Sequence, residues 1–157
     1  MRINKKLLAI CILIPVLVGG VSAFLTSDSM DSFLQLNKPS FAPPAWLFPV
    51  VWTILYILMG ISSYLVLTAV APKEDKELAL KFYVIQLAVN FLWSTFFFNY
   101  EWYLFAFFWL LLLWGLVLLM ILKFKQINIM ASYINIPYII WLTFALVLNF
   151  SIWILNR

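Results

Sequence analysis

The sequence predicts an all-α membrane protein, a bundle of five transmembrane helices, and two observations lead to this fold class. Of the 157 residues, 66% are apolar and only 10% are charged, which leaves too little polar surface to cover a soluble globule. The charged residues are also confined to short segments between long uncharged runs. Each run can supply the roughly 20 residues that cross about 30 Å of hydrocarbon.

The uncharged runs fix the order of the expected helices in a single domain, residues 1–157. They cover residues 7–25, 39–72, 82–100, 102–122 and 126–156. Pro43 and Pro44 suit the first turn of a helix, and Pro72 separates the second helix from the third. Pro15 and Pro137 fall inside the first and last helices and permit bends there. We therefore expect helices at about 6–26, 44–70, 78–99, 102–123 and 130–155.

The first helix has a second interpretation. A basic start, an apolar stretch and the small residues Val21-Ser22-Ala23 imitate a secretory signal with its cleavage site. The uncharged stretch continues to Leu25, however, which is longer than the roughly 7 to 15 residues of a signal core. A retained transmembrane helix is therefore favoured.

Lysine and arginine are divided unevenly between the two ends of the expected bundle. The end that holds the N-terminus carries eight basic residues, whereas the other end carries only Lys38 and Arg157. Because basic loops are retained in the cytoplasm, we expect a multi-pass protein of a bacterial cell membrane with its N-terminus inside and its C-terminus outside. The basic residues form no continuous patch, so nucleic acid is not an expected partner.

The residue types exclude several kinds of chemistry. With no histidine and one cysteine, Cys11, the chain cannot build a Cys/His zinc site, an internal disulfide or a Cys-His nucleophile pair; no metal site is expected. The uncharged runs argue against an ion pump or proton relay, which usually needs ionisable groups inside the membrane. A nucleophilic enzyme would have only Asp28, Asp31 and Glu101, at the membrane rim, as bases.

Three helices each carry a stripe of aromatic and polar side chains at membrane depth. Residues three or four positions apart share one helix face, and polar side chains usually face the bundle interior. The stripes could wall a cavity for a large, flat, mostly apolar ligand, or they could be simple helix contacts. Spacing alone favours the contacts. The stripes are Trp52, Tyr56, Met59 and Ser63, then Gln86, Asn90, Trp93 and Phe97, then Pro137, Tyr138, Trp141, Ala145, Leu148 and Asn149.

Several motifs, in matching order and spacing, are similar to those of the TspO/MBR family, the tryptophan-rich translocator proteins. Residues 38–60 read KPSFAPPAWLFPVVWTILYILMG, residues 86–94 read QLAVNFLWS, and residues 136–141 read IPYIIW. Leu148-Asn149 and residues 153–156, WILN, follow. The resemblance extends from the first loop to the C-terminus.

The resemblance implies a five-helix bundle, usually a homodimer, whose cavity beneath the first loop binds porphyrins such as protoporphyrin IX and haem, and benzodiazepine- or isoquinoline-type ligands. Porphyrin is then a ligand, and no cofactor is required. The usual tryptophan of the first-loop motif is Phe41 here, which loses an indole donor. A steroid-recognition pattern proposed in animal relatives is not matched at Phe150 and Ile154, so cholesterol transport is not expected. The resemblance implies that Phe33, Trp52, Asn90, Trp93, Trp141 and Ala145 bind the ligand, with Phe33 as the loop aromatic residue that closes the site. The stripes add Tyr56, Gln86 and Leu148 to the expected ligand-binding residues.

With the resemblance, a cavity becomes the favoured interpretation of the stripes, and a porphyrin-binding membrane receptor or sensor the favoured function. Because the chain has no imidazole to ligate iron, metal-free porphyrin should bind about as well as haem. Two alternatives stay open. One is light- and oxygen-dependent porphyrin breakdown, with Trp52 and Trp141 as candidate catalytic residues, and the other is porphyrin transport.

Overall fold

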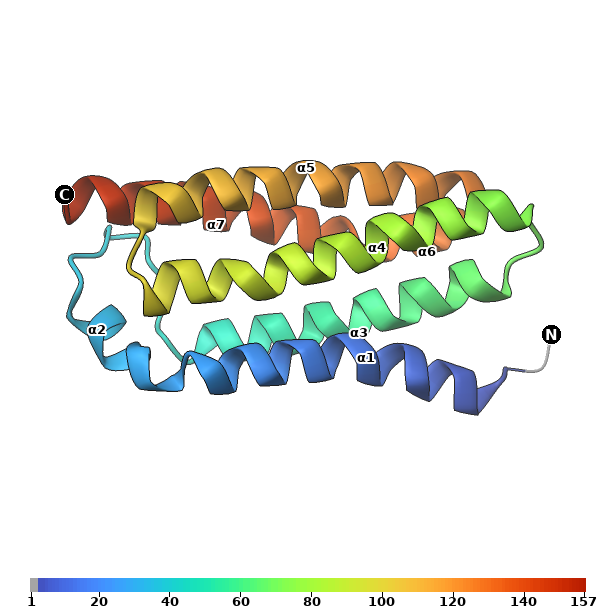
Figure 1. Ribbon diagram of the computed structural model, residues 1–157, viewed down its shortest axis with the longest axis horizontal. Coiled ribbons are helices and arrows are strands. Elements are labelled where there is room, and N and C mark those ends of the chain that lie inside the picture. Colours follow the sequence, from blue (N-terminus) through green and yellow to red (C-terminus); the bar gives the residue numbers. More distant parts are fainter. Residues whose placement is uncertain (1–2) are drawn as a thin grey trace.

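The computed structural model of the chain describes residues 3–157, with residues 30–32 described by their backbone alone. It confirms the all-α, five-helix fold, since five helical segments are long and apolar enough to cross a membrane. These segments run side by side along the long axis, with the two termini at opposite ends (Figure 1). The long helices are α1 (Lys5–Leu25), α3 (Leu47–Thr68), α4 (Lys73–Ser94), α5 (Tyr103–Ile127) and α7 (Ile136–Leu155). Shorter elements are η1 (Ser27–Ser29), α2 (Met30–Gln35), the π-helical turn η2 (Thr95–Asn99) and α6 (Ile129–Ile134).

The second spanning helix, α3, begins at Leu47, three residues later than expected from the prolines. Pro44 lies in a turn before the helix and accepts a hydrogen bond from the Leu47 amide at 3.0 Å. Pro49 occupies the first helical turn instead, where its missing N–H leaves no intrahelical bond unmade. At the other end, the Lys76 ammonium donates to the carbonyls of Leu67 and Ala69, both at 3.3 Å, and so stabilises the C-terminus of α3.

The third spanning helix, α4, begins at Lys73, so the expected start at residue 78 is wrong. The charged segment after Pro72 is itself helical. Glu74 and Asp75 lie in the first turn, where negative charge interacts favourably with the helix dipole, and Lys73 pairs with Glu77 at 3.4 Å. The charges end the membrane-spanning part without ending the helix, and α5 likewise continues past Lys123 to Ile127.

The last spanning segment is interrupted at Asn135, which divides it into α6 and α7. Pro137 consequently lies in the first turn of α7 and not in a helix interior as expected, which removes its conflict with helical hydrogen bonding. The Asn135 amide donates to Ser62 Oγ at 2.5 Å and to the Ala131 carbonyl at 2.8 Å. These bonds fasten the interruption to α3.

Helix α1 packs chiefly against α3, and Gly60 makes their closest approach possible. A Cβ atom at this position would lie 2.5 Å from Ile12 Cα and 2.7 Å from the Cys11 carbonyl oxygen. Real Cβ atoms do not approach backbone so closely, because the repulsion rises steeply at such distances. Gly60 therefore fixes the distance between the two helix axes.

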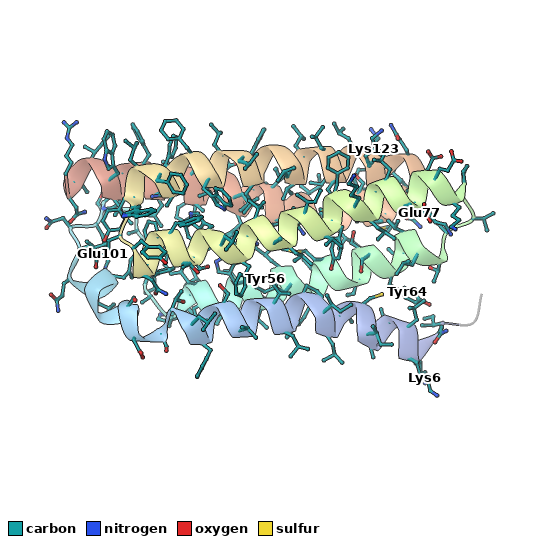
Figure 2. The ribbon with its side chains drawn as sticks, viewed as in Figure 1. Lys6, Tyr56, Tyr64, Glu77, Glu101 and Lys123 are labelled. Carbon is teal, nitrogen blue, oxygen red and sulfur yellow. The ribbon has the colours of Figure 1, made fainter. Side chains whose placement is uncertain are left out.

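The ends of the bundle carry the charged side chains. Lys6, Glu77 and Lys123 lie near one end, and Glu101 lies at the opposite end, beside the connection between α1 and α3 (Figure 2). Glu101 has a φ of 56°, in the left-handed region that side chains other than glycine seldom adopt. This residue makes the turn between η2 and α5 short. The separation of charged ends from an uncharged middle is that of a multi-pass membrane protein.

Candidate functional site

A cavity lies in the half of the bundle nearest the connection between α1 and α3. The cavity has a volume of about 180 Å³, and most of its wall is apolar. Four of the five long helices, α1, α3, α4 and α7, contribute residues to its wall. Phe33 of α2 and residues of η2 complete the lining. An apolar concave space with a few polar groups is the usual form of a small-molecule site.

Most of the sequence-predicted site residues meet at this cavity. Gln86 and Asn90 do not line it; they lie buried beyond its floor. The residues that do line it come from α2, α3, α4 and α7, so three separate stripes converge on one space. Their roles toward a ligand stay predictions. These lining residues are Phe33, Trp52, Tyr56, Trp93, Trp141, Ala145 and Leu148.

The aromatic wall is held in place by ring contacts. Trp52 stacks on Tyr56 with 5.6 Å between ring centroids, and its edge meets the Tyr138 ring at 6.2 Å. On the other side Phe48 meets Trp141 edge-on at 5.9 Å. Such offset and edge-to-face pairs are stabilising beyond the area that they bury. The cavity wall is therefore held in place by contacts within the protein.

A chain of hydrogen bonds lies beneath the floor and joins α3, α4 and α7. The Tyr56 hydroxyl donates to Asn90 Oδ1 at 3.4 Å, Asn90 Nδ2 donates to the Tyr138 hydroxyl at 2.8 Å, and that hydroxyl donates to Gln86 Oε1 at 2.9 Å. Gln86 Nε2 lies 3.8 Å from Met59 Sδ. Gln86 and Asn90 thus have partners inside the protein, which explains their burial in an apolar bundle.

Three polar atoms of the cavity residues have no such partner. The indole nitrogens of Trp93 and Trp141 and the side-chain oxygen of Asn149 are buried without a hydrogen bond within the described chain. Asn149 Nδ2 donates to the Tyr103 carbonyl at 3.0 Å, which fixes the orientation of the amide. An unpaired buried group costs about 1–3 kcal/mol. These two donors and one acceptor thus belong to residues that line the cavity and are not used by any other group of the described chain.

The contribution of α1 was missed from the sequence. Gly19, Ser22, Ala23 and Thr26 form one wall, and the Thr26 hydroxyl donates to the Ser22 carbonyl at 3.0 Å. These residues are small and carry no aromatic stripe, so only their four-residue spacing could have indicated them. The small residues that imitate a signal cleavage site thus have a structural reason to be small.

Phe33 of α2, in the first connection, contributes an aromatic side chain to the cavity wall. Its ring is 7% exposed and lies 6.1 Å from Phe48, 6.0 Å from Phe97 and 5.4 Å from Phe98. The Lys38 ammonium lies 4.8 Å from its centroid, within cation–π range. Residues 26–46, which we call the cover segment, therefore place an aromatic side chain at this end of the cavity.

Two asparagines anchor the cover segment to the bundle. Asn156, after α7, accepts a hydrogen bond from the Asn37 amide and donates one to its carbonyl, both at 2.9 Å. Asn99, in η2, accepts from the Ser29 hydroxyl at 2.8 Å and donates to the Leu25 carbonyl at 3.1 Å. The cover segment is thus fastened near its start, at Ser29, and near its middle, at Asn37.

This arrangement can be compared with known proteins. The TspO/MBR family model matches residues 11–154, a range that extends into all five spanning segments and contains every residue that lines the cavity. The chain belongs to the TspO/MBR family. The cavity of this TspO/MBR protein is therefore formed entirely by the part of the chain that defines the family.

Individual relatives from distant organisms agree with this assignment. The TspO/MBR protein is 42% identical over 122 residues to Protein CrtK of Rhodobacter capsulatus, 78% of this chain and 76% of that protein. It is 38% identical over 156 residues to Tryptophan-rich protein TspO of Chlorobaculum tepidum, 98% of this chain and 99% of that one. The human Translocator protein is 33% identical over 133 residues, 84% and 79% of the two chains. The alignment with the Chlorobaculum tepidum protein extends over nearly the whole chain.

Proposed function

We propose that this protein is a membrane receptor or sensor whose cavity binds porphyrins, protoporphyrin IX and haem among them, and that benzodiazepine- or isoquinoline-type ligands occupy the same space. The observation that carries the proposal is an aromatic cavity lined by Trp93 and Trp141, whose buried indole N–H groups have no partner within the described part of the chain. A flat, apolar ring system with acceptor atoms would stack on the wall and accept these hydrogen bonds. A homodimer, as the family resemblance implies, completes the proposal.

The chemistry of the site favours a ligand that is acidic at one edge. Lys38 belongs to the cover segment, and its ammonium group lies over the Phe33 ring. From there it can bind carboxylates that project from the cavity mouth. With no histidine in the chain, no imidazole is offered to iron. We expect metal-free protoporphyrin and haem to bind with similar affinity, through the ring and not through the metal.

The test is a titration of the detergent-purified protein with protoporphyrin IX, followed by tryptophan fluorescence and porphyrin absorbance. Trp93→Phe and Trp141→Phe should each raise the Kd roughly tenfold, because each variant would lose one hydrogen bond to the ligand in an apolar site, worth about 1.4 kcal/mol. Trp114→Phe is the matched control, since this indole donates to Thr143 at 2.9 Å away from the cavity. Trp114→Phe should bind protoporphyrin IX with the same Kd as the parent protein.

Equal affinity in Trp93→Phe, Trp141→Phe and the Trp114→Phe control would show that porphyrin binds elsewhere. A strong preference for haem, with the absorption spectrum of a ligated iron, would contradict the metal-independent version of the proposal. The same titrations, made with protoporphyrin IX and with haem, can detect either result.

The ring contacts of Trp52 favour a second candidate, light- and oxygen-dependent breakdown of the bound porphyrin. This indole lines the cavity and contacts the phenol rings of Tyr56 and Tyr138. The porphyrin would absorb the light, and the protein would orient it toward oxidisable rings. Illumination of the titrated samples in air separates the functions: decay that Trp52→Phe or Trp141→Phe abolishes while binding persists favours catalysis, and decay no faster than that of free porphyrin favours a receptor.

We further propose that the N-terminus is cytoplasmic, which places the cover segment outside the cell membrane. Lys6 and Lys123 lie at the end opposite Glu101 (Figure 2), and basic residues are retained inside. In a Cys11→Ser background, Ser27→Cys should react with a membrane-impermeant maleimide on intact cells. Glu77→Cys should react only after permeabilisation, and the reverse pattern would overturn this orientation.

A further inference from the structure

A glycine of α1 provides the space for an aromatic ring that belongs to α3. A Cβ atom at Gly19 would lie 2.1 Å from Cε2, 2.5 Å from Cδ2 and 2.8 Å from Cζ of Tyr56. The neighbouring Gly20 differs, since its Cβ would meet no atom of the described chain within 4 Å. The edge of the Tyr56 ring therefore rests in a recess of α1 that exists only because residue 19 has no side chain.

The Tyr56 ring also forms part of the cavity wall. It extends from α3 into the interior of the bundle (Figure 2), is 7% exposed, and lines the cavity together with Gly19. Trp52 covers one face of the ring at 5.6 Å, and Asn90 lies beyond the hydroxyl. The ring is thus bounded by α1, by Trp52, by the hydrogen-bonded floor and by the cavity, and only the last of these is open space.

The hydrogen bond of Tyr56 is too weak to hold the ring in this position by itself. Its length of 3.4 Å exceeds the usual 2.5–3.0 Å of an O–H···O bond, whereas Asn90 and Tyr138 bond at 2.8 Å. Packing against α1 and Trp52 therefore decides where the ring lies. If the recess were filled, the ring would move toward the cavity.

We propose that Gly19 is a specificity-determining residue, because its recess withdraws the Tyr56 ring from the cavity and so sets the width of ligand that the cavity accepts. A side chain at position 19 would narrow the space from the side of α3. A broad ring system, of tetrapyrrole size, would be excluded before a narrow bicyclic one. The proposal rests on the proposed function for the choice of both ligands, porphyrin as the broad one and an isoquinoline-type probe as the narrow one.

The experiment compares Gly19→Ala with Gly20→Ala, two glycine-to-alanine changes on one helix with the same intrinsic helix propensity. Each variant is titrated with protoporphyrin IX and with an isoquinoline-type probe. Gly19→Ala should weaken porphyrin binding at least tenfold, the fold-change that overpacking typically produces, and should weaken probe binding less. Gly20→Ala should match the parent for both ligands.

A double substitution separates the proposed role from a general effect on folding. In a Tyr56→Ala background the ring is gone, so adding Gly19→Ala should leave porphyrin affinity within about threefold of Tyr56→Ala alone. Loss of affinity by Gly19→Ala in this background would overturn the proposal, as would equal binding by Gly19→Ala and Gly20→Ala. If Gly19→Ala alone fails to fold, the comparison within the Tyr56→Ala background still tests the proposal.

Failure of the proposed function has a different signature. If the parent protein binds isoquinoline-type probes but no porphyrin, the porphyrin assignment is wrong, and a narrow and a broad probe of the isoquinoline type then replace the two ligands. Gly19→Ala should still discriminate against the broad probe. Equal loss of both probes would reject the width-setting role.

Discussion

Gly60→Ala is expected to prevent the normal docking of α1 on α3. The new methyl carbon would lie 2.5 Å from Ile12 Cα and 2.7 Å from the Cys11 carbonyl oxygen, and neither backbone atom can rotate away as a side chain can. Overpacking a core usually costs about 1–3 kcal/mol, and sometimes more; a backbone clash should reach or exceed the upper end. Thermal unfolding in detergent, followed by tryptophan fluorescence, should show a large decrease in midpoint.

Gly115→Ala provides the matched control for this prediction. Gly115 lies inside α5, and an added Cβ would meet no atom of the described chain within 4 Å. Alanine should therefore leave stability unchanged or raise it by about 0.5–1 kcal/mol, through the smaller loss of backbone entropy. If the two variants unfolded at the same temperature, the close approach of α1 to α3 at Gly60 would be wrong.

Tyr138→Phe should have the largest effect among the polar side chains of the interior. The Tyr138 hydroxyl accepts from Asn90 Nδ2 and donates to Gln86 Oε1, so its removal leaves two buried amides each without one partner. An unpaired buried group costs about 1–3 kcal/mol, whereas hydrogen bonds between membrane helices average about 0.6 kcal/mol. A loss of about 2 kcal/mol in the free energy of unfolding is therefore expected from chemical denaturation in mixed micelles.

Tyr133→Phe tests whether the loss of a hydroxyl, and not the change of residue type, is responsible. Tyr133 of α6 is 55% exposed, and water or lipid headgroups can replace any contact of its hydroxyl. Its stability should equal that of the parent within error. A Tyr138→Phe variant as stable as Tyr133→Phe would mean that Asn90 and Gln86 find other partners, and that the hydrogen bonds beneath the cavity contribute little.

The five helices could be predicted because lipid imposes one dominant requirement, a long stretch without charge. The ends of the helices are determined by other interactions. Lys73–Glu77 is charged and still helical, since a charged turn outside the membrane satisfies its hydrogen bonds as well as an apolar turn does. The break at Asn135 depends on side-chain bonds to Ser62 of another helix, and a local sequence pattern does not carry that information. The π-helical turn at Thr95–Asn99 gave no recognisable signal either.

The cavity was predictable where aromatic rings and amides share a helix face, as on α3, α4 and α7. It was not predictable on α1, where Gly19 and Ser22 contribute by being small, and small residues suit many other purposes. The same spacing that placed Trp93 in the wall also suggested Asn90 as a wall residue. Spacing identifies which face of a helix points into the bundle. It does not show how far the cavity extends along that face, because this limit is set by the Tyr138 hydroxyl from a third helix.

The anchoring of the cover segment has a consequence for the order in which the protein folds. Asn37 and Asn156 are 119 positions apart in the chain, and contacts between such distant residues form late because the loop between them must first be ordered. The cavity should therefore be assembled while still open at its mouth, and close only when α7 has joined the bundle. A ligand present during insertion would meet a site with walls but without its cover.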